Sequence, residues 1–171
     1  MDFEIVKAKL SDAAAISALI QTVYEAMDHK EWYVADNAEY TSNVLTAGNG
    51  TGYLAVEARS GELAGIFLVT FPGMSPENLG NDIGFSNEQM LLTAHMESAA
   101  VLPKYRGHHL QYRLMQAAEA DLRKAGYRYL LCTIHPDNRY SKDNALRQGY
   151  QVIKTTEKYG GYLRDILQKV L

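Results

Sequence analysis

The stretch from Val101 to Met115 constrains the fold of this chain more than any other part of the sequence. An apolar run that ends at Leu102 is followed by Pro103 and by a short basic loop, which contains Arg106 and Gly107. Leucine and alanine then recur every four residues, a spacing that predicts a helix with one buried face. The first N–H groups of a helix have no partner within it and carry the positive end of its dipole. A strand, a basic loop and a helix start therefore predict an anion site, for which a phosphate-bearing ligand is the natural occupant.

Apolar periodicity on both sides of this stretch predicts further strands and helices in alternation. Strands are predicted at 3–7, 53–58, 63–69, 95–101, 129–134, 150–155 and 162–171. Helices are predicted from 11 to 27, in a short segment ending near 45, from 86 to 92, from 110 to 125 and from 141 to 148. This order predicts an α/β fold with a mixed, mostly antiparallel sheet of about seven strands and helices on both faces. No linker, repeat or composition break appears, so we expect a single domain over residues 1–171.

Charge and cysteine content narrow the class of protein. The formal net charge of −3 and the pI near 5.9 argue against a protein that coats nucleic acid, which would need a basic face. Cys132 is the only cysteine, so an internal disulfide is excluded and a reducing compartment is favoured. The first residues lack the apolar core of a signal peptide, and no apolar run approaches the roughly 20 residues of a membrane span. We therefore expect a soluble, cytoplasmic protein.

Two separated motifs give the sequence a family resemblance. The first runs from Val101 to Gly107 and is followed by the predicted helix and strand; the second comprises Asn138 to Ser141 with Gly149 and Tyr150 after it. Together they resemble the GNAT superfamily of acetyl-CoA-dependent N-acetyltransferases. The resemblance covers nearly the whole chain in element order and is specific from about His95 to Tyr150. It implies transfer of an acetyl group from acetyl-CoA, as cosubstrate and with no metal, to the primary amine of a small molecule or peptide by direct attack in a ternary complex.

The resemblance also implies where the coenzyme is held. In this family the pantetheine arm lies between the fourth and fifth strands, so the backbone of Ala99, Ala100 and Val101 would pair with it. An N–H group there would polarise the thioester carbonyl in the manner of an oxyanion hole. Asn138 and Ser141 match the later motif, which contacts the far side of the coenzyme. The residues implied for the pyrophosphate are those of the loop and helix start: Arg106, Gly107, His108, His109, Leu110, Gln111 and Tyr112.

Three positions depart from the family pattern. His109 and Gln111 stand where the family usually has small residues, and a side chain there limits how closely the backbone approaches phosphate. Many members carry a tyrosine seven residues after the asparagine, which protonates the departing thiolate. Ala145 occupies that position here, so the usual general acid is absent. These departures favour one alternative function, a non-catalytic domain that binds or senses acyl-CoA.

Acetylation of an amine requires a neutral amine, and hence a general base. Glu97 is the first candidate, because it lies in the fourth strand just before the expected thioester site, and His95 is the second. For the thiolate, Tyr140 or Tyr150 is a candidate proton donor. Water is an alternative, since a thiol with a pKa near 8.5 leaves without much help. The plainer roles are packing against the coenzyme for Tyr140 and a place in the core for Tyr150.

Strand alternation predicts how the fourth strand presents these groups. Glu97 is expected on one face with Ala99 and Val101, and Met96 and Ser98 on the other. A final strand at the sheet edge, residues 162–171, would offer a pairing surface for a second copy.

Other candidate chemistries have weaker support. His108 and His109 are adjacent at a helix start and diverge, so no metal site is expected. Cys132 lies within an apolar strand, where an inert core thiol is expected. No Gly-Lys-Ser/Thr follows the loop, which argues against a nucleoside triphosphate. The acceptor is expected to contact segments 28–40, 72–87 and 158–162, of which the first combines carboxylates with aromatic rings that would attract an ammonium.

Overall fold

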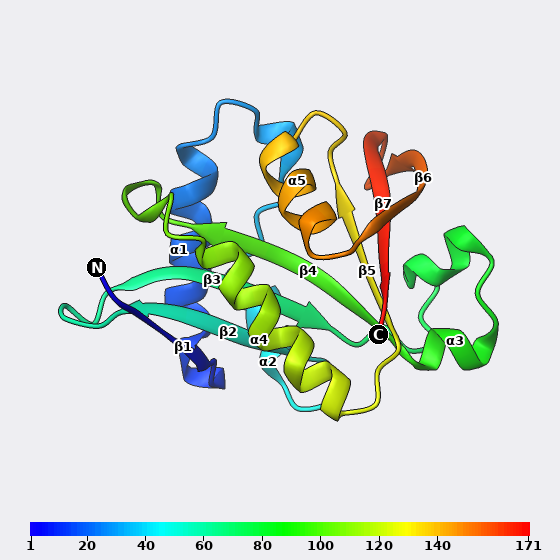
Figure 1. The fold of residues 1–171 in the computed structure, drawn as a ribbon, viewed down its shortest axis with the longest axis horizontal. Coiled ribbons are helices and arrows are strands. Elements are labelled where there is room, and N and C mark those ends of the chain that lie inside the picture. Colours follow the sequence, from blue (N-terminus) through cyan, green and yellow to red (C-terminus); the bar gives the residue numbers. More distant parts are fainter. The chain divides into compact units, whose positions relative to one another are not determined.

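A computed structural model describes residues 1–171 (Figure 1). The strands are β1 (Phe3–Lys7), β2 (Gly50–Glu57), β3 (Leu63–Thr70), β4 (Thr93–Val101), β5 (Tyr129–Ile134), β6 (Gln151–Lys158) and β7 (Tyr162–Val170). The α-helices are α1 (Ala13–Glu25), α2 (Ala38–Leu45), α3 (Asn87–Leu91), α4 (Leu110–Lys124) and α5 (Arg139–Arg147). The seven strands have the sheet order β1-β2-β3-β4-β5-β7-β6. Parallel pairing of β4 with β5 beside antiparallel pairs confirms the predicted mixed sheet.

The chain divides into two compact units, which are described separately. The first unit comprises residues 1–70 and 97–121, and the second comprises residues 71–96 and 122–171. The division falls within β4, so the first residues of this strand belong to the second unit. None of the helices is both long and apolar enough to cross a membrane.

The first unit packs helices against both faces of its strands. Side chains alternate along β2, so Leu54 joins Ile66 of β3 in a core cluster with Ile16 and Ile20 of α1. The neighbouring residue of β2, Tyr53, points to the other face of the sheet, and its hydroxyl donates to Asp121 of α4 at 2.8 Å. The cluster with α1 and the contact with α4 therefore lie on opposite faces, and Figure 1 shows α4 in front of the strands and α1 behind them.

The second unit is built on β5, which pairs with β4 over Thr93–His95 and with β7 along its whole length. Leu130 and Leu131 of β5 are fully buried, as expected for a strand that is covered on both sides. The prediction that the final strand lies at an edge is wrong, because β7 lies between β5 and β6. The physical reason is burial: Ile166 and Leu167 of β7 are fully buried, whereas β6 is mostly exposed and forms the edge.

Local caps account for most helix boundaries. Asn37 accepts from the Tyr40 N–H at the start of α2, and a capping box of Ser86 with Gln89 opens α3 at the start of the helix predicted from 86 to 92. The first helix begins later than the predicted position 11, because a 3₁₀ turn at Leu10–Asp12 precedes α1 and Asp12 is the residue before its first turn.

Candidate coenzyme and acceptor sites

The start of α4 presents unpaired backbone donors. The first backbone bond at this end of the helix runs from the Arg113 N–H to the His109 carbonyl at 3.0 Å. The N–H groups of Leu110, Gln111 and Tyr112 precede it and have no acceptor in the helix. No acidic residue lies in the first turn, so no carboxylate competes with an incoming anion for these donors.

The loop before α4 adopts backbone conformations that favour glycine. Gly107 has φ +85°, and the space that a Cβ would occupy there is open. His109 has φ +56°, in the left-handed region where a residue with a side chain is strained by about 1 kcal/mol. His109 thus keeps the conformation that a glycine would adopt at this position. Gln111 lies inside α4 and needs no such conformation.

Contacts on either side hold this loop in place. The buried Tyr105 hydroxyl donates to Glu62 at 2.5 Å, and the Lys104 ammonium also binds Glu62, at 2.7 Å. The His108 ring packs against Phe3 with centroids 5.2 Å apart. Lys104 is thereby engaged by a carboxylate, whereas Arg106 is exposed in the loop that leads into α4.

The end of β4 combines a buried and a half-buried face. Ala100 is 3% exposed and belongs to the core cluster with α1, while Ala99 and Val101 are half-buried. Gly65 of β3 permits close approach, because a Cβ there would lie 3.1 Å from the Ala100 carbonyl oxygen. Glu97 is exposed and Ser98 is buried, so the burial pattern confirms the predicted alternation along the strand.

Glu97 is anchored by two hydroxyl donors within the first unit. Tyr40 of α2 donates to one carboxylate oxygen at 2.8 Å, and Thr70 of β3 donates to the other at 3.1 Å. The next residue, Ser98, is in short hydrogen-bond contact with the Tyr33 hydroxyl. The segment between α1 and β2 therefore contacts two adjacent residues of β4.

Asp36 is the carboxyl group that is most perturbed near Glu97. Burial and, to a smaller extent, the negative charge of Glu97 raise the pKa of Asp36 to about 7, against a smaller lowering by a hydrogen bond from Ser98. Burial also raises the pKa of Tyr33. The sequence placed Asp36 only among the carboxylates of segment 28–40. Its proximity to Ser98 spans 62 positions of the chain and has no local sequence signal.

His95, the second candidate base, makes a structural contact with the segment before α3. Its Nε2 accepts the Leu79 N–H at 3.1 Å, and its side chain is buried. Burial and the nearby Lys158 lower the pKa of His95 to about 4, against a smaller opposing effect of Asp82. A neutral imidazole whose Nε2 already accepts a hydrogen bond is poorly suited to take up a further proton.

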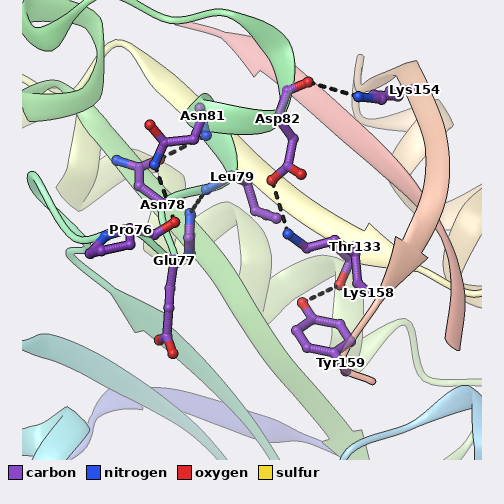
Figure 2. A network of polar contacts seen from close by, with 12 residues as sticks. Pro76, Glu77, Asn78, Leu79, Asn81, Asp82, Thr133, Lys154, Lys158 and Tyr159 are labelled. Atoms are coloured by element: carbon purple, nitrogen blue, oxygen red, sulfur yellow. Dashed lines mark hydrogen bonds and ion pairs between the residues drawn. The ribbon is translucent and has the colours of Figure 1, made fainter. Parts of the chain in front are cut away.

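Figure 2 shows how the long 71–92 segment is fixed within the second unit. The Asp82 carboxylate binds the Lys158 ammonium at 2.9 Å, and the Asp82 carbonyl accepts from Lys154 at 3.2 Å. At the end of the same β6–β7 hairpin, the Tyr159 and Thr133 hydroxyls lie 2.8 Å apart. A long connection such as this is typically functional or mobile, and here ionic and hydrogen-bond contacts attach it to the hairpin.

The second motif forms the start of α5. Asn138 caps this helix by accepting the Ser141 N–H at 3.3 Å, so these two residues bind each other. Tyr140 is 62% exposed in the first turn, whereas Tyr150 is 2% exposed in the core, as expected. Ala145 is 1% exposed, so the position where many family members carry the acid is closed over by the core.

A buried ion pair ties α5 to β7. Lys142 binds one oxygen of Asp165 at 2.7 Å, and Thr155 donates to the other at 2.6 Å. Burial on its own would raise the pKa of Asp165, but hydrogen bonds from Lys142 and Thr155, with the charges of Lys142 and His135, leave it below the usual range. The first turn of α5 is therefore positioned by an ionic contact one turn after Asn138.

The remaining chemistry-bearing residues do not form a further site. No group of three His, Cys, Asp or Glu side chains could hold a metal ion. Cys132 is buried, and burial raises its thiol pKa to about 12. At that pKa almost no thiolate exists at neutral pH, so Cys132 is an inert core residue as predicted.

Comparison with known proteins identifies the family. The model of the acetyltransferase (GNAT) family matches residues 15–150. This match covers most of the chain, so the protein belongs to the GNAT acetyltransferase family. It is an acetyltransferase, and its cosubstrate is acetyl-CoA. No curated protein matches this chain significantly.

Solved structures give the same fold at low sequence identity. A GNAT-family acetyltransferase from Streptococcus pneumoniae matches with a TM-score of 0.75, 16% identity and 99% coverage of both chains. An acetyltransferase from Salmonella typhimurium, solved with its cofactor acetyl-CoA, matches with a TM-score of 0.74 and 16% identity over 99% of this chain and 94% of that one. A ribosomal-protein-alanine N-acetyltransferase from Brucella melitensis matches with a TM-score of 0.72 and 19% identity over 98% of this chain and 99% of that one.

Proposed function

We propose that residues 1–171 act as a single N-acetyltransferase domain, which transfers the acetyl group of acetyl-CoA to a primary amine by direct attack in a ternary complex. The match of the family model to residues 15–150, which takes in residues of both compact units, supports one functional domain. The observation that carries the proposal is the start of α4, where unpaired N–H groups, exposed Arg106 and the absence of acidic residues suit a pyrophosphate.

Three groups of residues in the chain would hold the coenzyme. Arg106 and the N–H groups from Gly107 to Tyr112 would bind the pyrophosphate, and the open space at Gly107 allows a phosphate close to the backbone. The backbone of Ala99 to Val101 would pair with the pantetheine arm and donate an N–H to the thioester carbonyl. Asn138 and Ser141 would contact the far side, with the exposed Tyr140 packing there. The coenzyme supplies an acetyl group that is activated as a thioester.

The acceptor amine would meet Glu97, which would act as its general base. This carboxylate is exposed and is held by Tyr40 and Thr70, so it offers a fixed negative charge that attracts an ammonium group. Aromatic side chains of segment 28–40 would add cation–π attraction for an ammonium group. A small amine and a peptide amine both fit this chemistry, and the net charge of −3 favours a cationic acceptor over a nucleic acid.

The departing thiolate would leave without a dedicated acid. Ala145 replaces the family tyrosine, and its burial leaves no room for a donor at that position. Water is sufficient, because a thiol with a pKa near 8.5 is a good leaving group near neutral pH. The exposed Tyr140, which belongs to the second motif, is an alternative proton donor.

The experiment that tests the proposal is acetyl transfer from acetyl-CoA to a panel of small amines and short peptides, followed as release of coenzyme thiol. Glu97→Gln is expected to lower turnover at least tenfold while the affinity for acetyl-CoA stays the same. Glu4→Gln, an exposed glutamate on β1, is the matched control and should leave the rate unchanged. No thiol release with any amine would refute the enzyme and favour a domain that only binds acyl-CoA.

Two further points belong to this proposal. A cytoplasmic location is supported by the lone Cys132, which is free and suits a reducing compartment. Pairing with a second copy would use β6, because this strand and not β7 lies at the sheet edge. Val152 and Ile153 on β6 are 39% and 45% exposed, so a dimer there would cover apolar side chains.

A further inference from the structure

The loop between β4 and α4 has a backbone conformation that depends on contacts outside the loop. Gly107 and His109 both have positive φ, of +85° and +56°, and His109 is strained there because it carries a side chain. Strained backbone persists only where the surrounding structure fixes it. The loop's own short turn, Pro103–Tyr105, ends before either residue. The contacts that fix this loop must therefore come from neighbouring elements of the first unit.

Glu62, the residue before β3, supplies one such contact. One of its carboxylate oxygens binds the Lys104 ammonium at 2.7 Å and accepts the Tyr105 hydroxyl at 2.5 Å. Hydrogen bonds from Lys104 and Tyr105 hold the pKa of Glu62 below its usual range, so the carboxylate is ionised at neutral pH. The Lys104 side chain is 59% exposed, so its ion pair is weak, whereas Tyr105 is buried. Tyr105 is therefore the main route by which Glu62 acts on the loop.

Both partners of the Glu62–Tyr105 contact are themselves anchored. Glu62 lies at the end of the β2–β3 turn, where its carbonyl accepts the Glu57 N–H at 2.9 Å. The Glu57 carboxylate in turn accepts the N–H and the hydroxyl of Ser60, at 2.7 and 2.6 Å. On the loop side, the Tyr105 ring packs edge-on against Phe3 of β1, with centroids 5.5 Å apart. A hydrogen bond between two anchored groups fixes the position of the loop that carries one of them.

We propose that Glu62 is a positioning residue for the coenzyme: through Tyr105 it holds the loop before α4 in the conformation that binds the pyrophosphate. This inference rests on the proposed pyrophosphate site. The apparent affinity of a ligand falls with the fraction of the protein that is in the binding-competent conformation. Loss of one hydrogen bond to a charged group is expected to lower that fraction roughly tenfold.

Charge alone predicts the opposite effect of removing Glu62. Glu62→Ala takes away a negative charge beside the loop and frees Lys104 to reach a phosphate, and both changes favour an anion. On that ground the variant would bind coenzyme A more tightly. Weaker binding is expected only if Glu62 matters for the position of the loop more than for its charge.

The first test requires no ligand. The backbone N–H groups of Tyr105 and Arg106 are hydrogen-bonded within the turn of the loop, so their hydrogen exchange, followed by NMR in the full chain, reports its opening. Exchange at these two groups should be faster in Glu62→Ala. Glu62→Gln keeps an oxygen that can accept the Tyr105 hydroxyl, so its exchange should stay close to wild type. Unchanged exchange in Glu62→Ala would overturn the proposal.

The second test is the dissociation constant of coenzyme A, measured by isothermal titration calorimetry. We expect Kd to rise roughly tenfold in Glu62→Ala and in Tyr105→Phe, which removes the hydroxyl and keeps the ring. Glu62→Gln should restore most of the affinity, because position rather than charge is required. Glu4→Gln, an exposed glutamate on β1, is the control and should match the wild type. An unchanged or lower Kd in Glu62→Ala, or a wild-type Kd in Tyr105→Phe, would overturn the proposal.

The outcomes separate the inference from the function on which it rests. In the acetyl-transfer assay, Glu62→Ala should raise KM for acetyl-CoA and leave kcat at saturation close to wild type. Coenzyme binding by the wild type that Glu62→Ala leaves intact would overturn the role of Glu62 alone. No binding of coenzyme A by the wild type, with faster exchange at Tyr105 in Glu62→Ala, would refute the pyrophosphate site and the role of Glu62 together.

Discussion

Removal of Lys142 should reveal how strongly the buried ion pair holds α5. Asp165 is 2% exposed and both of its oxygens are bound, by Lys142 at 2.7 Å and by Thr155 at 2.6 Å. Lys142→Met leaves this carboxylate buried with one partner missing. Removal of one partner from a buried ion pair typically costs about 3–5 kcal/mol of folding stability. The Lys142 side chain is 27% exposed, and water admitted there favours the low end, so we expect a loss of about 3 kcal/mol at pH 7.

The pH dependence of this loss has a definite sign. In the wild type the pKa of Asp165 is lowered by its partners, so its contribution is present above the unfolded pKa near 3.9 and disappears as pH falls through the lower folded value. In Lys142→Met, burial is no longer offset by the lysine and raises the pKa. The variant should therefore be less stable than wild type at pH 7, and the difference should shrink as pH falls and Asp165 becomes protonated.

The assay is urea unfolding followed by far-UV circular dichroism at pH 7 and near pH 4. Lys124→Met, an exposed lysine at the end of α4, is the control and should change stability by less than about 0.5 kcal/mol. Asp165→Asn added to Lys142→Met should recover much of the loss, because it removes the unpaired charge. An equal loss at both pH values, or no recovery in the double variant, would refute the electrostatic explanation.

Three further predictions concern His95, His109 and Lys158. Burial and Lys158 lower the pKa of His95 to about 4, whereas the unfolded value is near 6.5. The neutral His95 therefore contributes about 3 kcal/mol of stability above pH 6.5, and this contribution is lost as pH falls towards 4. His95→Gln should flatten the decline in urea midpoint over that pH range. His109→Gly should relieve the strain of φ +56° and leave stability unchanged or higher by up to about 1 kcal/mol, measured by thermal unfolding. Lys158→Met should release Asp82 and speed hydrogen exchange at 79–83, whereas the exposed Lys124→Met should not.

The sequence predicted much of the fold because its signals are local. The strand at Phe3–Lys7 and the strand at Tyr129–Ile134 have the predicted bounds, and the capping box at Ser86 opens a helix as expected. The edge position of the last strand was predicted wrongly, since the order of strands in a hairpin depends on which strand the core buries on both faces. Ile166 and Leu167 decide this through contacts that are distant in sequence.

The candidate site shows the same limit. The backbone features of the helix start follow from Arg106, Gly107 and the periodicity after them, all within a few residues. The association of Asp36 with Ser98, and of Tyr40 with Glu97, depends on how segment 33–40 folds over β4. Neither association leaves a periodic or motif signal in the chain. The sequence therefore indicated the coenzyme side more fully than the acceptor side.

The most direct test of the central claim is a thermal-shift titration with coenzyme A, acetyl-CoA and ATP, performed on the wild type and on Arg106→Ala. A ligand that binds only the folded state raises the melting temperature by mass action. We expect a concentration-dependent rise with coenzyme A and acetyl-CoA that exceeds any rise with ATP and is reduced in Arg106→Ala. The absence of a shift with both coenzyme A and acetyl-CoA would contradict the account.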